Sequence, residues 1–186
     1  MTLAEETKMA YAIGLTLDRK LEGQVRQLWH QFEAAGVGKT PGQFDEPPHI
    51  TFSAFPSGNP ATLIELLEAT PVTDSSIRLI PFGAFLGDKH VLYYSAVLSQ
   101  GLLQAHAKHC DLIRAQSIEY NLTYVPGTVL FHCTMAVDIE PGDFLKGIDI
   151  CVNNHEVLEG AVEHMELFEF FPVKPIHRRR LIPDKK

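Results

Sequence analysis

The sequence has no long apolar run and few cysteines. No stretch approaches the roughly 20 apolar residues that a helix needs to cross a bilayer, and the first residues, MTLAEETK, are too acidic for a signal peptide. The three cysteines, Cys110, Cys133 and Cys151, are odd in number and widely spaced. That pattern is typical of a reducing compartment rather than of a disulfide framework. We therefore expect a cytoplasmic protein with no membrane partner.

An excess of basic charge is also missing. The chain carries 16 lysines and arginines against 23 aspartates and glutamates, a net charge of −7. This balance argues against a broad nucleic-acid-binding surface, but a locally positive site on an acidic protein can still bind a small nucleotide or an RNA end. The 45% of hydrophobic residues excludes a disordered chain. With no recognisable linker in the chain, we expect residues 1–186 to form a single bilobal domain and the protein to be a monomer.

One four-residue pattern occurs twice: a histidine, any residue, a threonine and an apolar residue. The copies are His49-Ile50-Thr51-Phe52 and His132-Cys133-Thr134-Met135. Each lies in a run rich in β-branched and aromatic residues, which predicts a strand. Because successive side chains of a strand point to opposite faces, each motif presents its imidazole beside its hydroxyl. The histidines are 83 residues apart in the sequence, so the motifs act together only in a fold that brings two similar halves face to face.

Two imidazoles and two hydroxyls that converge on one site suit chemistry at a phosphodiester. A neutral histidine takes a proton from attacking water while a protonated one gives a proton to the leaving oxygen, and the ordinary imidazole pKa of about 6.5 makes both forms available near neutral pH. Threonine hydroxyls donate hydrogen bonds to the non-bridging phosphate oxygens, where negative charge develops. This arrangement requires no metal.

The two motifs resemble the signature of the 2H phosphoesterase superfamily, which includes the RNA 2′,3′-cyclic phosphodiesterases also called 2′-5′ RNA ligase-like proteins. The signature is a pair of His-x-Thr/Ser-x motifs, each on a central strand of one lobe. Residues 48–52, PHITF, match the common form of the first motif, whereas Phe131 stands where the family often has proline. The resemblance extends over most of the chain, from Ala10 to Val173. It implies an α+β, two-lobed 2H phosphoesterase (LigT-like) fold, with two pseudo-symmetric antiparallel-sheet lobes, outer helices and a central cleft.

The resemblance also implies an activity, the hydrolysis of a 2′,3′-cyclic phosphate on a nucleotide or RNA end to a phosphomonoester. His49 and His132 would be the general acid and base, Thr51 and Thr134 would hold the phosphate, and no cofactor would be needed. The sequence does not tell which histidine is the acid. The alternative is a non-catalytic module on the same fold that binds a nucleotide or an RNA end.

Hydrophobic spacing and turn residues predict the order of elements. Strands are expected over Met9–Leu17, around the two motifs, over Ser76–Leu86 and Val91–Leu98 as a hairpin, and around Val162–Phe171. Helices are expected over Lys20–Ala35, Pro60–Ala69, Gly101–Ser117 and Pro141–Val152. This mixture predicts an α+β or α/β chain with antiparallel strand pairs.

Two further patterns allow a second interpretation. Gly36-Val37-Gly38-Lys39-Thr40 is similar to the end of a phosphate-binding P-loop, but Glu33 stands where that pattern needs glycine, which favours a plain loop. His106, His109 and Cys110 have the spacing of metal ligands on a helix. His106, however, falls within an apolar stripe, which favours a hydrogen-bonded core histidine.

The basic end of the chain and two aromatic residues are further candidates for contact with RNA. The segment from His177 to Arg180, with Lys185 and Lys186, fits either a contact to RNA phosphates or a solvated tail. Phe44 and Tyr124 precede the two motif strands and are candidates, by position only, to stack on a base.

Overall fold

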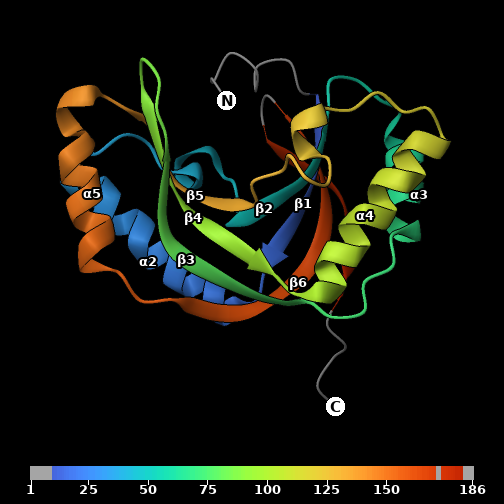
Figure 1. Cartoon of the computed structure of the whole chain (residues 1–186). Helices are drawn as coiled ribbons and strands as arrows, with labels where there is room; N and C mark the ends of the chain where they lie inside the picture. Colours follow the sequence, from blue (N-terminus) through green and yellow to red (C-terminus); the bar gives the residue numbers. More distant parts are fainter. Residues whose placement is uncertain (1–9, 171–172, 182–186) are drawn as a thin grey trace.

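The structure is a computed structural model, and it describes residues 10–170 and 173–181 (Figure 1). The strands are β1 Tyr11–Leu17, β2 His49–Phe55, β3 Ser76–Phe85, β4 His90–Leu98, β5 His132–Ile139, β6 Leu158–Glu169 and β7 Lys174–Arg180. The helices are α2 Arg19–Ala35, α3 Pro60–Ala69, α4 Gln100–Ala115 and α5 Phe144–Asn153, with short 3₁₀ turns at Pro41–Phe44, Leu122–Tyr124 and Pro141–Asp143. None of the helices within the described ranges is long and apolar enough to cross a membrane.

Local capping signals set the ends of the helices. The side chains of Asp18, Asn59 and Ser99 each accept a hydrogen bond from a backbone N–H in the first turn of α2, α3 and α4. Helix α2 ends where Gly36 takes a left-handed conformation with φ of 65°, which glycine adopts at little cost. The predicted helices are therefore confirmed to within a few residues at each end.

The strands form one seven-stranded sheet in the order β2-β1-β6-β3-β4-β5, with β7 paired to β6. Every pair of neighbouring strands is antiparallel. Strand β6 belongs to both lobes, because residues 158–161 pair with β3 while residues 162–169 pair with β1. The predicted α+β fold with two antiparallel-sheet lobes is confirmed, and the long strand β6 joins the two lobes into one sheet.

The helices pack outside the sheet in a crossed arrangement. In Figure 1, α2 and α5 lie at the left of the curved sheet and α3 and α4 at its right. Helix α2 follows β1 in sequence but packs against β5, where Trp29 Nε1–H donates a hydrogen bond to the carbonyl oxygen of Thr134 at 3.0 Å. Helix α4 follows β4 but contacts β2, where Phe52 packs against the rings of His106 and His109. Each half of the chain therefore supports the motif strand of the other half.

The end of the chain differs from the expectation of a solvated tail. Residues 174–180 form strand β7, and Arg178 donates two hydrogen bonds to the buried carboxylate of Glu166, at 2.9 and 3.0 Å. The tail interpretation was wrong for this segment because alternating side chains of β7 satisfy groups on β6. Lys185 and Lys186 lie outside the described residues.

Candidate functional site

Both motifs lie on strands with the alternation that the sequence predicts. In β2, Ile50 and Phe52 are fully buried while His49 and Thr51 are half-buried. The first four residues of β5 repeat this pattern, with the histidine and the threonine half-buried and the residues after each of them buried. The half-buried side chains share one face of the sheet, opposite the helices. We call this the motif face, defined by His49, Thr51, His132 and Thr134.

The two motif strands, at the opposite ends of the strand order, meet in space. The sheet is curved so that β2 and β5 contact each other. Burial raises the pKa of the Cys133 thiol to about 12, and the backbone of His49 lies close enough to oppose this rise. The structure therefore brings together two segments that are far apart in the sequence, as the motif repeat predicts.

The two imidazoles are held in the same way. Nδ1 of His49 lies 2.9 Å from the carbonyl oxygen of Pro47, and Nδ1 of His132 lies 2.8 Å from that of Leu130. A carbonyl oxygen only accepts hydrogen bonds, so Nδ1 must carry a proton in both rings. In the neutral form Nε2 then has a free lone pair, and in the charged form it has a proton to donate. Both histidines are thus oriented to exchange a proton through Nε2.

Aromatic residues that the sequence reading missed surround the imidazoles. Phe85 of β3 packs edge-on against His132 at 5.1 Å between ring centroids, and Tyr93 of β4 lies at the same centroid distance. Phe168 of β6 packs against His49 at 5.8 Å. These residues come from three different strands, so no local sequence pattern indicates them.

A glycine makes room for the first imidazole. Gly14 pairs with Thr51 across β1 and β2. A Cβ atom at this position would lie 3.1 Å from the Phe168 ring and 3.5 Å from the His49 ring. The first contact is tighter than side chains normally tolerate, so the absence of a side chain at Gly14 lets Phe168 approach His49.

The electrostatic surroundings of the two histidines differ. Burial lowers the pKa of His132; the hydrogen bond with Leu130 opposes this shift, and the positive charge of His49 adds to it. Near the first motif, burial raises the pKa of the Glu46 carboxyl, and the charge of His49 opposes that rise. Glu46 and His49 belong to the same wall of side chains, together with Phe168. The environment of His132 therefore favours its neutral form, and a second titratable group, Glu46, lies beside His49.

The histidines of α4 are part of the core. His106 is buried and its Nε2 lies 2.9 Å from the carbonyl oxygen of Tyr124. This confirms the interpretation of His106 as a hydrogen-bonded core histidine. Within the described ranges, no group of three or more histidine, cysteine or acidic side chains is arranged to hold a metal ion.

His109 is held on both sides by hydroxyl groups. Thr70 Oγ1 donates to the carbonyl oxygen of Leu66 and therefore accepts from Nδ1 of His109 at 2.8 Å. Ser53 Oγ then donates to Nε2, also at 2.8 Å. Burial lowers the pKa of His109 to about 3, and the charges of His106 and Arg179 add to this shift. The ring is therefore a neutral link between α3, α4 and the first motif strand.

The remaining candidates from the sequence have structural positions. Lys39, in the segment that resembles a P-loop, forms a bridge to Val137 of β5 and an ion pair with Asp138 at 3.0 Å, so this segment extends the sheet beside the second motif. The Tyr124 side chain is buried against Ala12, which removes its ring as a platform for a base. Phe44 is partly exposed.

The chain resembles solved structures in its fold. The chain is similar to the structure titled MHV ns2 PDE domain, with a TM-score of 0.50 and 14% identity over 91% of this chain and 98% of that one. Usb1 of Kluyveromyces marxianus with uridine monophosphate has a TM-score of 0.44 and 11% identity over the same shares of the two chains. No family model matches the sequence, and no curated protein matches it.

The first of these structures belongs to the 2H phosphoesterases, and its likeness extends over nearly the whole of both chains. Taken with the antiparallel sheet and its helices, it identifies the architecture. The chain has the 2H phosphoesterase fold.

Proposed function

We propose that this protein is a phosphodiesterase that opens a 2′,3′-cyclic phosphate, carried by a nucleotide or by an RNA end, to a phosphomonoester. His49 and His132 act as general acid and base, and Thr51 and Thr134 hold the phosphate. The 2H phosphoesterase fold supports this reading at the level of the class, and the motif residues support the particular reaction.

The observation that carries the proposal is the matched anchoring of the two imidazoles. Each Nδ1 is bound to the carbonyl oxygen two residues before it, on two strands that contact each other. A core histidine usually has both nitrogens satisfied by the protein, as His109 does. Within the part of the chain that the structure describes, Nε2 of each motif histidine has no hydrogen-bond partner, so that this atom remains for acid–base catalysis.

The proposed step balances without a cofactor. The base takes a proton from water as the water oxygen forms a bond to phosphorus. The bond from phosphorus to one ribose oxygen breaks, and the acid gives its proton to that oxygen. The neutral-favouring environment of His132 suits the base, which leaves His49 as the acid.

Replacement of either histidine by alanine tests the proposal. We expect His49→Ala and His132→Ala each to lower kcat for uridine 2′,3′-cyclic phosphate by about 10²-fold to 10⁴-fold. The melting temperature should remain close to that of the wild type, because both side chains are only half-buried. His155→Ala, which changes an exposed histidine outside the motif face, is the matched control. Activity that is lost with a chelator and restored by zinc or manganese would contradict the metal-free mechanism.

The alternative function, a module that binds a nucleotide or an RNA end without turnover, gives a different result. Such a module would show no hydrolysis in the wild type, and the two alanine variants would change its affinity only modestly. Hydrolysis by the wild type that both variants lose rules out the binding module.

A further inference from the structure

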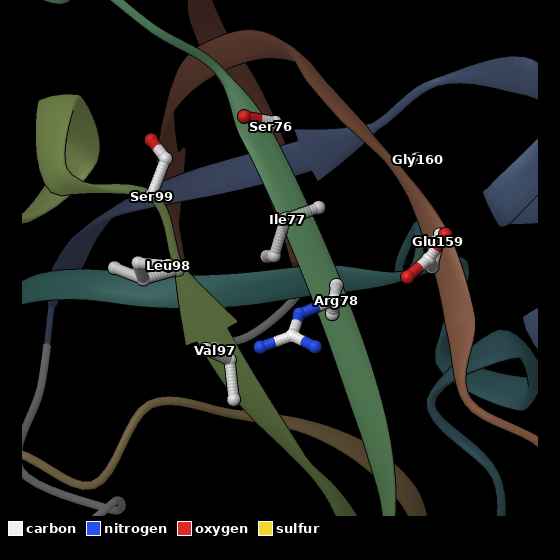
Figure 2. Close-up of a pocket in the computed structure, with 8 residues that line it drawn as sticks. All are labelled: Ser76, Ile77, Arg78, Val97, Leu98, Ser99, Glu159 and Gly160. Carbon is white, nitrogen blue, oxygen red and sulfur yellow. The ribbon is translucent and has the colours of Figure 1, made fainter.

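A pocket of about 420 Å³ opens on the second lobe, outside the pair of motifs. It lies over β3, β4 and the first residues of β6, and Figure 2 shows the side chains that line it, including Arg78, Val97 and Glu159. The pocket is wide and open to solvent. Its one basic side chain is Arg78, whose guanidinium extends from β3 toward Val97 of β4 (Figure 2).

The strand register places this pocket on the motif face. His132 of β5 pairs with Ser95 of β4, and Val97, two residues further along β4, points to the same side. Val97 in turn pairs with Arg78 of β3. With strands about 4.8 Å apart and about 3.3 Å per residue, the Cα atoms of Arg78 and His132 are about 12 Å apart along the surface of the sheet. The pocket is thus a continuation of the surface that carries the second motif.

Arg78 is available to a ligand. Its guanidinium makes no hydrogen bond and no ion pair with any residue that the structure describes, and the residue is exposed. The neighbouring hydroxyls of Ser76 and Ser99 are instead directed to Asp74. The other arginines on this sheet face, Arg178 and Arg180, are engaged by glutamates of β6. A planar guanidinium with five donors and no protein partner suits a phosphate group.

We propose that Arg78 binds a backbone phosphate upstream of the reacting one, so that the substrate is an oligonucleotide end rather than a mononucleotide. The inference rests on the proposed function for the position of the reacting phosphate. A strand whose 3′ end lies between the motifs reaches the pocket in the 5′ direction, because a terminal cyclic phosphate leaves no other direction for the chain. Val97, partly exposed beside Arg78, offers an apolar surface to the adjoining sugar or base.

Substrates of different length and two charge variants test this inference. The probes are uridine 2′,3′-cyclic phosphate and a uridine trinucleotide with the same cyclic end. We expect the trinucleotide to have a kcat/KM roughly tenfold higher, and Arg78→Gln to remove most of that gain while it leaves the mononucleotide unchanged. Arg114→Gln, an identical change on the outer helix α4, is the matched control.

Replacement of Glu159 should have the opposite effect on the trinucleotide to replacement of Arg78. Its carboxylate belongs to the same pocket and pairs with Arg78 in the register of β3 and β6. A phosphate bound at Arg78 is repelled by this charge, so Glu159→Gln should increase kcat/KM for the trinucleotide and not for the mononucleotide. Trinucleotide binding should also depend on salt, and Arg78→Gln should reduce the slope of log affinity against log salt by about 0.7.

The outcomes separate this inference from the proposed function. Equal kcat/KM for both substrates, with no effect of Arg78→Gln, overturns the role of Arg78 and leaves the hydrolase intact. If no substrate is turned over, the proposed function fails. The affinity for the trinucleotide then tests the role of Arg78 without any activity measurement. Binding that Arg78→Gln weakens supports the phosphate contact, and binding that it leaves unchanged overturns it.

Discussion

At the scale of single residues, the proposed chemistry divides between imidazoles that move protons and hydroxyls that hold charge. Thr51 and Thr134 are half-buried beside their histidines, on the motif face. Gly14 and Phe168 add nothing to proton transfer, but they fix the position of the His49 ring. The site therefore depends on more side chains than the histidines and threonines of the two motifs.

The threonines provide the test at this scale. Thr51→Val and Thr134→Val keep the β-branched shape but remove the hydroxyl, so the fold should survive. We expect each change to lower kcat/KM by about tenfold to a hundredfold, equivalent to about 1.5 to 3 kcal/mol for a hydrogen bond to a charged oxygen. Steady-state kinetics on uridine 2′,3′-cyclic phosphate measures this loss.

Serine at the same positions is the control for the hydroxyl. Thr51→Ser and Thr134→Ser restore the donor and should recover much of the activity. Full activity in both valine variants would mean that the hydroxyls do not touch the phosphate.

At the scale of elements, β7 holds the first lobe through an ion pair whose carboxylate is buried. Glu166 is 1% exposed and Arg178 satisfies both of its oxygens, whereas the neighbouring pair of Arg180 and Glu163 is more exposed. Arg178→Gln leaves the buried carboxylate without its charge partner, so we expect a loss of about 1 to 3 kcal/mol in the free energy of unfolding. Urea denaturation measures it.

The neighbouring arginine of β7 is the matched control. Arg180→Gln should cost less than about 1 kcal/mol, because its ion pair is partly exposed to water. Adding Glu166→Gln to Arg178→Gln should recover part of the loss by removing the buried charge. Equal losses in the two single variants would show that the burial of Glu166 does not matter.

The second prediction at this scale concerns the acid stability of the α4 packing. His109 has a pKa of about 3 in the folded protein against about 6.5 when unfolded, so between these values the unfolded chain binds the extra proton. Stability is therefore lost as pH falls through this window, by up to about 1.4 kcal/mol per pH unit from this group.

Comparison with a variant that cannot titrate at this position isolates the effect. His109→Gln keeps polar atoms for Ser53 and Thr70 but has no proton to gain. Between pH 6 and pH 4 the free energy of unfolding of the wild type should fall more steeply than that of the variant. Parallel curves would mean that His109 is protonated in the folded state.

At the scale of the whole molecule, the curvature of the sheet brings its two ends together. The charge of His49 therefore affects the pKa of His132. Burial lowers the pKa of His132, and the charge of His49 lowers it further. We expect an NMR titration to give His132 a pKa below 6.5, and His49→Gln to raise that pKa.

The lowered pKa of His132 also determines how kcat/KM depends on pH. If His132 is the base, it must be neutral, so kcat/KM should fall on the acid side with an apparent pKa below 6.5. An unchanged His132 titration in His49→Gln would mean that the two lobes do not place the imidazoles close enough to interact.

Local patterns predict much of this molecule. The alternation around His49 and His132 fixes which side chains share a face, since a strand has a period of two residues whatever it pairs with. The spacing of Leu21, Val25 and Phe32 predicts α2, and the capping residues set its ends. The hairpin of β3 and β4 follows from two strand patterns with a turn between them.

Local sequence patterns do not predict which distant segments pair with each other. Residues 174–180 became a strand because β6 offers a free edge and a buried carboxylate for Arg178, and neither is visible in the basic run itself. Phe85, Tyr93 and Phe168 reach the imidazoles from three strands whose register depends on bulges. The pocket at Arg78 likewise depends on the register of β3 with β4 and β6, which places Arg78 beside Val97 and Glu159.

The sequence by itself determined the chemical types at the motifs and the face on which each motif presents them. Those properties depend on backbone geometry within a few residues. Tertiary structure alone decided that the ends of the sheet meet, that Nδ1 of each imidazole is bound, and that His132 and His49 have different electrostatic surroundings. These properties depend on burial and on charges from strands far apart in the chain, which only the folded arrangement brings within reach of each other.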